Sequence, residues 1–194
     1  MRKGGVYLAI GDSITWTGAT RGADLYAFRV REAIKTNYAP IRLINKGIGG
    51  SDSLDAVRNT TWHSMLDPDL ITIGLGMNDA ANNVIPVTQY KDNLRKLIDN
   101  FRIKNSEVSI VLCTPSRSSE ASRSDLASYR TAMAEVATEK NVGLARFENA
   151  FTDGEIATYC PDGIHPNSAG HQKLYDVLWP VIQSTADKWL NKLQ

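Results

Sequence analysis

This sequence of 194 residues has almost no excess of positive or negative charge, only two cysteines and no long apolar run. The formal net charge is +1 and no segment forms a basic run, so the chain has no charge signature of nucleic-acid or anionic-membrane binding. No apolar run approaches the length that crosses a bilayer. We therefore expect neither a nucleic-acid partner nor a membrane partner.

The N-terminus predicts no signal peptide. Only five apolar residues, at positions 6–10, follow the polar start before Gly11. This run is too short for the apolar core of a signal peptide. We therefore expect a cytoplasmic protein, although a mature secreted form or a module released from a larger particle would look the same.

Thiol and imidazole ligands are few as well. The two cysteines, Cys113 and Cys160, favour free thiols, with Cys113 buried in a strand, but whether they pair stays open. Two of the three histidines, His63 and His171, show no metal-ligand spacing, and the chain has no H-E-x-x-H run. We expect no metal ion and no cofactor, and we place His171 on the surface of a helix.

The remaining composition is that of an ordinary globular protein. Apolar residues make up 42% of the chain and charged residues 22%. The length is sufficient to bury a sizeable core. Since no repeat, low-complexity tract or linker interrupts the sequence, one domain is expected over residues 1–194.

Strand and helix signals alternate along the chain. Apolar residues recur at helical spacing over residues 88–104, and further helices are expected from near Asp24, after Ser124 as N-cap, and from near Asn167. Such alternation predicts a parallel sheet covered by helices on both faces. Five short runs rich in β-branched residues predict strands at 6–10, 41–45, 70–75, 108–113 and 142–147.

Four loops of this sheet carry residues suited to catalysis. Right-handed crossovers bring all strand-to-helix loops to one edge of the sheet, where such folds bind ligands. Residues far apart in the sequence can therefore meet there. The four loops contain G-D-S at 11–13, N-K-G-I-G-G at 45–50, G-L-G-M-N-D at 74–79 and D-G-I-H-P at 162–166.

Ser13, His165 and Asp162 have the chemistry of a nucleophile, its base and an orienting acid. A serine hydroxyl needs a base to accept its proton, and an imidazole titrates near neutrality and can return that proton to the leaving group. Asp162, three residues before His165, could hold the imidazole in the required tautomer. The Ser13 amide, an amide of the Gly49–Gly50 turn and the Asn78 side chain could stabilise an oxyanion.

Together these loops resemble the motif blocks of the SGNH hydrolases, the GDS-motif esterases and lipases. Residues 11–13 match the first block, which holds the nucleophile, and residues 162–166 match the fifth, which holds the acid and base. The resemblance implies a flavodoxin-like, three-layer α/β/α fold with Gly50 and Asn78 as oxyanion donors. The chain departs from the family at Gly18, where the block-one glycine comes late, and at Gly49–Ser51, where Ser-Gly-Asp is more common.

Three other interpretations compete with the hydrolase. The T-x-T-G-x-T run at 15–20 is typical of phosphate loops in flavin binders, but it does not open a helix directly after the strand. A metal-dependent phosphoesterase could use Asp12, Asp79 and His165. A catalytically dead carbohydrate-binding module could retain the same fold. The flavin interpretation leaves Asp162 and His165 unexplained, and the metal interpretation lacks further histidines at ligand spacing.

We therefore predict a metal-independent serine esterase that works through an acyl-enzyme. Short-acyl esters of carbohydrates or small alcohols are the expected substrates, with a lysophospholipase or thioesterase of the same family as the alternative. Arg117 and Arg123 flank a polar loop that favours solvation over binding of an acidic substrate. The oligomeric state is open. Candidate pocket residues beside the motif blocks are Trp16, Gly49, Met77 and Tyr159.

Overall fold

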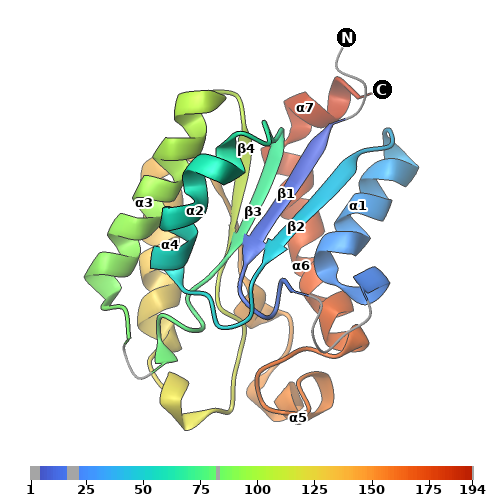
Figure 1. The fold of residues 1–194 in the computed structure, drawn as a ribbon. Helices are drawn as coiled ribbons and strands as arrows, with labels where there is room; N and C mark the ends of the chain where they lie inside the picture. Colours follow the sequence, from blue (N-terminus) through green and yellow to red (C-terminus); the bar gives the residue numbers. More distant parts are fainter. Residues whose placement is uncertain (1–4, 17–21, 82–83, 194) are drawn as a thin grey trace.

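Five parallel strands form the central layer of the protein (Figure 1). The computed structural model describes the whole chain except residues 1–4, 17–21, 82–83 and 194. The strands are β1 (Val6–Gly11), β2 (Arg42–Gly47), β3 (Leu70–Gly74), β4 (Ser109–Cys113) and β5 (Gly143–Ala145). Their order in the sheet is β2-β1-β3-β4-β5, and every neighbouring pair is parallel.

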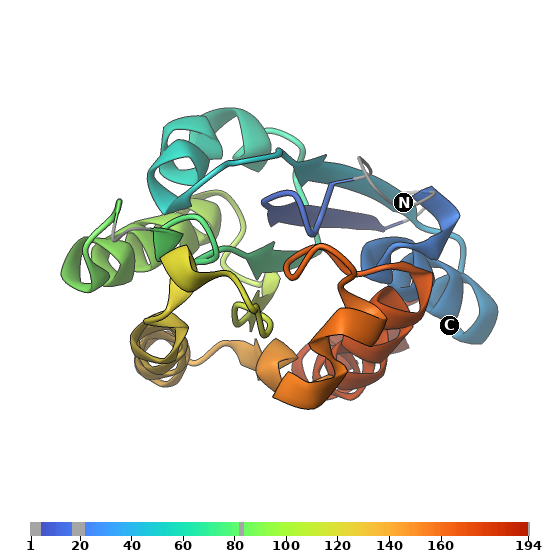
Figure 2. The ribbon, with the colours of Figure 1, turned by 90° about the horizontal axis from the view of Figure 1, so that it is seen from below.

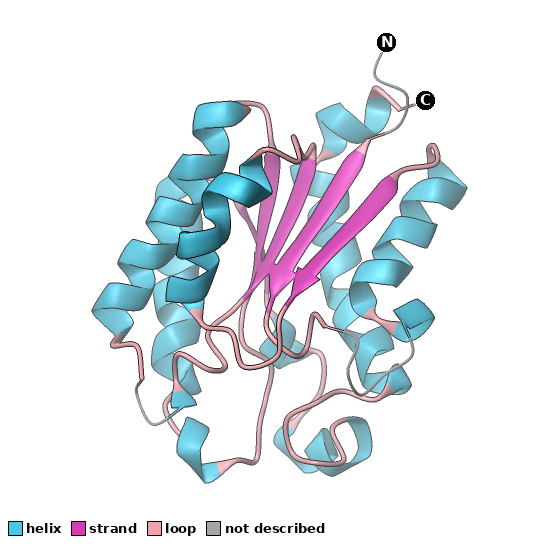
Figure 3. Ribbon diagram, viewed as in Figure 1, coloured by secondary structure: helices cyan, strands magenta, loops and turns pink. Residues whose placement is uncertain are grey.

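Helices cover both faces of this sheet, so the three-layer α/β/α prediction is confirmed (Figures 2 and 3). The α-helices are α1 (Tyr26–Asn37), α2 (Ser53–Ser64), α3 (Val87–Lys104), α4 (Leu126–Lys140), α5 (Ile156–Tyr159), α6 (Ser168–Thr185) and α7 (Asp187–Asn191). Helices α2, α3 and α4 pack side by side on one face, and α1 and α6 pack together on the other. Short 3-10 turns lie at η1 (Gly22–Asp24), η3 (Ala121–Arg123), η4 (Phe147–Asn149) and η5 (Asp153–Glu155).

The strands and helices end close to where the sequence predicts, with differences that have local causes. Strand β5 ends at Ala145 because the Thr114 hydroxyl, rather than a backbone carbonyl, accepts the Phe147 amide at 2.9 Å. The N-cap of α4 is Asp125 rather than Ser124, which closes the preceding 3-10 turn. Near Asp24 the chain forms only a 3-10 turn, and α1 begins at Tyr26.

The buried core follows the apolar periodicity. All six residues of β1 are buried, as a strand covered on both faces requires. Both cysteines are free and buried, with Cys113 in β4 as expected, and burial raises the pKa of the Cys160 thiol to about 12. On α3 the predicted inward face is confirmed by the burial of Tyr90, Leu94, Leu97, Ile98 and Phe101.

The predicted surface position of His171 is wrong. His171 is 2% exposed and lies on the inward face of α6 with Leu174 and Leu178, at positions i, i+3 and i+7. Its Nδ1 accepts the Tyr26 amide at 3.5 Å, and its ring stacks on the Tyr26 ring. Desolvation, with a smaller effect of the Arg29 charge, lowers the pKa of His171 to about 4. The imidazole is therefore neutral at physiological pH.

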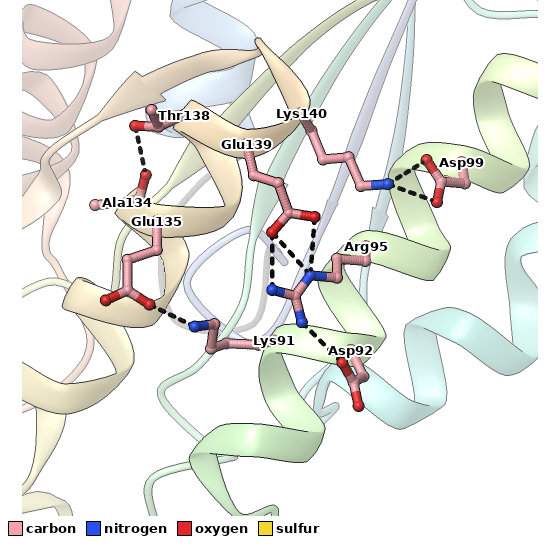
Figure 4. Close-up of polar contacts among 9 residues, drawn as sticks. All are labelled: Lys91, Asp92, Arg95, Asp99, Ala134, Glu135, Thr138, Glu139 and Lys140. Atoms are coloured by element: carbon pink, nitrogen blue, oxygen red, sulfur yellow. Dashed lines mark hydrogen bonds and ion pairs between the residues drawn. The ribbon is translucent and has the colours of Figure 1, made fainter.

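A ladder of ion pairs joins α3 to α4 on the outside of the layer (Figure 4). The Arg95 guanidinium contacts both oxygens of Glu139 and also Asp92. One helical turn away, the Lys140 ammonium contacts both oxygens of Asp99 at 2.8 and 2.9 Å. Because these groups are largely open to solvent, the ion pairs contribute little to the stability of the fold.

Within the described part of the chain, no helix is both long enough and apolar enough to cross a membrane. The same residues contain no cluster of three or more His, Cys, Asp or Glu side chains that could hold a metal ion.

Candidate active site

The four motif loops lie together at the carboxyl edge of the sheet, onto which Figure 2 looks. Strands β1, β2 and β3 end side by side, with Gly11 paired to Gly47 on one side and to Gly74 on the other. The loop that follows α5 returns to this edge from the far end of the chain. The parallel register therefore brings distant segments of the sequence into one site.

A tight turn directly after β1 presents Ser13. The amides of Thr15 and Trp16 both donate to the Asp12 carbonyl at 3.1 Å, and the Asp12 carboxylate accepts the Ile14 amide at 2.9 Å. Asp12 is buried, and desolvation raises the pKa of its carboxyl to about 7. Ser13, which lies between these contacts, is half-buried.

The Asp162–His165 loop is organised by the Asp162 carboxylate. One of its oxygens accepts the amides of Ile164 at 3.0 Å and His165 at 2.7 Å, and the other lies 2.6 Å from His165 Nδ1. Desolvation alone would raise the pKa of Asp162, but these hydrogen bonds outweigh it and bring the pKa to about 2. Asp162 is therefore ionised at physiological pH.

The imidazole of His165 connects this loop to the serine. His165 Nε2 lies 2.8 Å from Ser13 Oγ, across 152 positions of sequence. A carboxylate, an imidazole and a hydroxyl are thus arranged in series at hydrogen-bonding distances. This is the geometry in which a carboxylate orients a base that activates a nucleophile.

Gly50 and Asn78 lie on neighbouring loops that are bonded to each other. Gly50 has a φ of 77°, a conformation that favours glycine, and no atom lies within 4 Å of the position of a Cβ. The Asn78 side-chain amide donates to the Ser51 carbonyl at 2.9 Å. That amide has two hydrogens, and among the described residues only the Ser51 carbonyl is seen to accept one of them.

The predicted pocket residues have different surroundings. The Trp16 side chain is 48% exposed, and a Cβ on Gly49 would lie 3.8 Å from its ring, so these two residues form one exposed rim. Met77 is buried. The Tyr159 ring packs against Phe151, with the Lys173 ammonium over it. Contact of Trp16, Gly49, Met77 or Tyr159 with substrate stays a prediction.

The structure bears on two further points of the sequence, the T-x-T-G-x-T run and the charge of Arg117. Thr15, the first residue of the T-x-T-G-x-T run, is buried with its hydroxyl 2.7 Å from the Tyr26 hydroxyl, which is unsuited to a phosphate ligand; residues 17–21 lie outside the described residues. Arg117 donates to the Glu148 carbonyl and to the Asp153 carboxylate, at 2.8 and 2.6 Å. Its charge is therefore already paired within the protein.

The site also depends on two residues, Asn45 and Tyr26, to which the sequence analysis gave no role. The side chain of Asn45, inside the second motif, donates to the Thr15 carbonyl at 2.7 Å and accepts the Gly47 amide at 2.8 Å. This bond ties the loop after β2 to the serine turn. Tyr26, whose hydroxyl contacts that of Thr15, belongs to none of the four motifs.

The sequence of residues 9–173 matches the GDSL-like lipase/acylhydrolase family. The chain belongs to this family. It is accordingly a carboxylic ester hydrolase, and the predicted resemblance to GDS-motif esterases and lipases is confirmed. The matched region begins in β1 and extends into α6, so it contains all four motif loops.

Proteins similar to this chain include two that are named as an esterase or an esterase homolog. An isoamyl acetate-hydrolyzing esterase 1 homolog of Homo sapiens is 24% identical over 211 aligned positions, which cover 91% of this chain and 80% of that protein. An uncharacterized protein of Mycoplasma pneumoniae is 30% identical over 120 residues, but the chain spans only 14% of its length. A catalytic mutant of Axe2, an acetylxylan esterase from Geobacillus stearothermophilus, superposes with a TM-score of 0.76 at 24% identity, covering 94% of this chain and 96% of that one.

Proposed function

We propose that the chain hydrolyses acetyl and other short-acyl esters of carbohydrates or small alcohols through an acyl-enzyme on Ser13. The observation that carries the proposal is the series of contacts from Ser13 Oγ to His165 Nε2, at 2.8 Å, and from His165 Nδ1 to Asp162 Oδ2, at 2.6 Å. No cofactor or metal ion takes part in the proposed reaction.

In the first half-reaction, Ser13 Oγ attacks the ester carbonyl carbon while His165 Nε2 accepts the hydroxyl proton. The carbonyl oxygen becomes an oxyanion, which accepts hydrogen bonds from the amides of Ser13 and Gly50 and from the Asn78 side chain. When the intermediate collapses, the alcohol leaves with the proton held by His165, and the acyl group stays on Ser13.

In the second half-reaction, a water molecule attacks the acyl carbon and His165 accepts its proton. Collapse of the second tetrahedral intermediate releases the carboxylic acid, and the proton returns to Ser13 Oγ. Throughout, Asp162 holds Nδ1 of the imidazole protonated and stabilises the imidazolium that forms in each half-reaction.

The preference for short acyl groups is inferred from the relatives of the chain. The names of two relatives, an acetylxylan esterase and an isoamyl acetate-hydrolyzing esterase homolog, support acetyl esters as the class of substrate.

A panel of p-nitrophenyl esters from acetyl to palmitoyl, with acetylated xylo-oligosaccharides, tests this proposal. We expect kcat/KM to fall with acyl length and turnover to be lost in Ser13→Ala, by roughly 10⁶-fold as for other serine nucleophiles. A preference for palmitoyl would replace the short-acyl assignment by a lysophospholipase or thioesterase. Turnover that survives in Ser13→Ala would refute Ser13 as the nucleophile, and no turnover of any ester by the wild type would favour a carbohydrate-binding module.

A further inference from the structure

A chain of buried polar groups runs from α3 to the loops that carry Gly50 and Asn78. Asp79, the residue after Asn78, is fully buried. Both of its carboxylate oxygens accept the Ser53 amide, at 3.1 and 3.2 Å. Ser53 is the first residue of α2, so a buried carboxylate of one loop is bonded to the N-terminus of the helix that follows the other.

The Ser53 side chain extends this chain of contacts. Its hydroxyl oxygen accepts a hydrogen bond from the Asn93 side-chain amide at 2.9 Å, and its hydroxyl also bonds to Asp79. Asn93 is 2% exposed and lies on the inward face of α3, among apolar residues. A buried amide is expensive to desolvate and is tolerated where it has a partner, and Ser53 is that partner.

Gly50 and Asn78, the two proposed oxyanion donors, lie next to residues of these contacts. Gly50 immediately precedes Ser51, whose carbonyl accepts the Asn78 amide at 2.9 Å. Two residues after Ser51 the same segment enters α2 at Ser53, whose amide donates to the Asp79 carboxylate. The segment from Gly50 to Ser53 is therefore fixed to the segment 78–79 at two points, and α3 fixes the second of these points through Asn93.

We infer that Asp79 and Asn93 are positioning residues that set the separation of the Gly50 amide and the Asn78 amide around the oxyanion. This inference rests on the proposed esterase mechanism. Neither side chain touches the substrate. They act through Ser53 and through the Asn78–Ser51 contact, since oxyanion donors stabilise a transition state only when they are held in place beforehand.

The decisive experiment is a double-mutant cycle between Asn93→Ala and Asn78→Ala on p-nitrophenyl acetate. We expect Asn93→Ala to lower kcat about 10-fold with little change in KM, because a displaced donor weakens transition-state binding and leaves ground-state binding intact. In the Asn78→Ala background the same substitution should lower kcat by much less, because the donor that it positions is already absent.

A second readout measures the oxyanion site without turnover. The affinity for a trifluoromethyl ketone, which forms a tetrahedral adduct with the serine, should fall in Asn93→Ala by the same factor as kcat/KM. Tyr7→Phe is the matched control, since it removes another buried hydrogen bond, between the Tyr7 and Thr72 hydroxyls at 2.9 Å in the middle of the sheet. It should lower stability and leave kcat and inhibitor affinity unchanged.

Three outcomes overturn the inference: an unchanged kcat in Asn93→Ala, full additivity with Asn78→Ala, or an equal loss of kcat in Tyr7→Phe. If Asn93→Ala does not fold, Ser53→Ala removes the shared hydroxyl with a smaller change in volume and should give the same kcat loss and the same coupling. Loss of turnover in Ser13→Ala, measured alongside, keeps the esterase mechanism standing if the positioning inference alone fails.

Discussion

The hydroxyl groups of Tyr26 and Thr15 lie 2.7 Å apart, where the first residue of α1 meets the turn that presents Ser13. Both side chains are buried. The Thr15 side chain in turn fills the space beside Gly11 and Gly47, where a Cβ on either glycine would overlap it. The serine turn is therefore held in place by the Tyr26 contact from α1 as well as by its own contacts with Asp12.

Tyr26→Phe removes this support without a change in ring packing. The Thr15 hydroxyl then loses its partner in a buried site, and we expect a loss of about 1–2 kcal/mol in the free energy of unfolding. Because Thr15 belongs to the turn, kcat should fall as well. Urea denaturation and p-nitrophenyl acetate turnover measure the two effects.

Tyr7→Phe is the matched control for that experiment. The Tyr7 hydroxyl lies 2.9 Å from the Thr72 hydroxyl, also in a fully buried site, but in the middle of the sheet. The loss of stability should be similar, whereas kcat should not change. Equal effects of the two variants on kcat would show that Tyr26 supports the fold and not the serine turn.

Gly11→Ala should disrupt the site by steric overlap. A Cβ at this position would lie 2.1 Å from Thr15 Oγ1 and 2.7 Å from the Gly74 carbonyl oxygen, and the latter cannot move without breaking the sheet. We expect a loss of about 1–3 kcal/mol in stability, as for other overpacked sites, with a marked fall in kcat. Gly154→Ala, where no atom lies within 4 Å, should change neither. Wild-type stability and activity in Gly11→Ala would contradict the close packing of Thr15 on β1.

Asp162→Asn should lower kcat by about 10³–10⁴-fold, less than Ser13→Ala, because Asp162 forms no bond to substrate. The amide nitrogen cannot accept the Nδ1 proton, so the wrong imidazole tautomer is favoured. The pKa of Asp162 is about 2, and an acid limb of the pH–rate profile above that value therefore belongs to another group. Asp153→Asn, at an exposed ion pair with Arg117, is the control and should keep full activity. If the two variants were equally active, the proposed role of Asp162 would be wrong.

The sheet and the gathering of the four loops could be predicted because each depends on a local pattern and one general rule. Short apolar runs predict strands, helical spacing predicts helices, and right-handed crossovers place the loops at one edge. Ser13 and His165 are 152 positions apart, yet this rule alone brings them to the same edge. Their 2.8 Å contact follows from the details of two loops.

The features that the sequence does not predict are contacts between segments that share no sequence pattern. The Asn93–Ser53 contact joins two helices, and a lone asparagine on an apolar helix face carries no sign of its partner. The sequence predicts His171 on the surface because histidine is less often fully buried than apolar residues, although its spacing with Leu174 matches the inward face of α6. In both cases the burial of a polar group is explained only by the partner that another helix supplies.

The buried His171 should make the stability of the protein depend on pH between neutrality and about pH 4. Its pKa is about 4 in the folded protein, against the ordinary imidazole value of 6.5 in the unfolded chain. Below pH 6.5 the unfolded chain therefore binds a proton that the folded protein excludes, so stability is complete above that pH and is lost as the pH falls toward 4. The shift corresponds to about 3 kcal/mol at most.

His171→Gln isolates this contribution, since glutamine does not titrate and its carbonyl can still accept the Tyr26 amide. Urea denaturation of both proteins at about pH 7 and about pH 4.5 should show a smaller acid-induced loss in the variant. Carboxylates such as Asp162 contribute equally to both proteins and cancel in the comparison. The same pH dependence in wild type and variant would mean that His171 is protonated in the folded protein, contrary to its burial against Tyr26 and near the Arg29 charge.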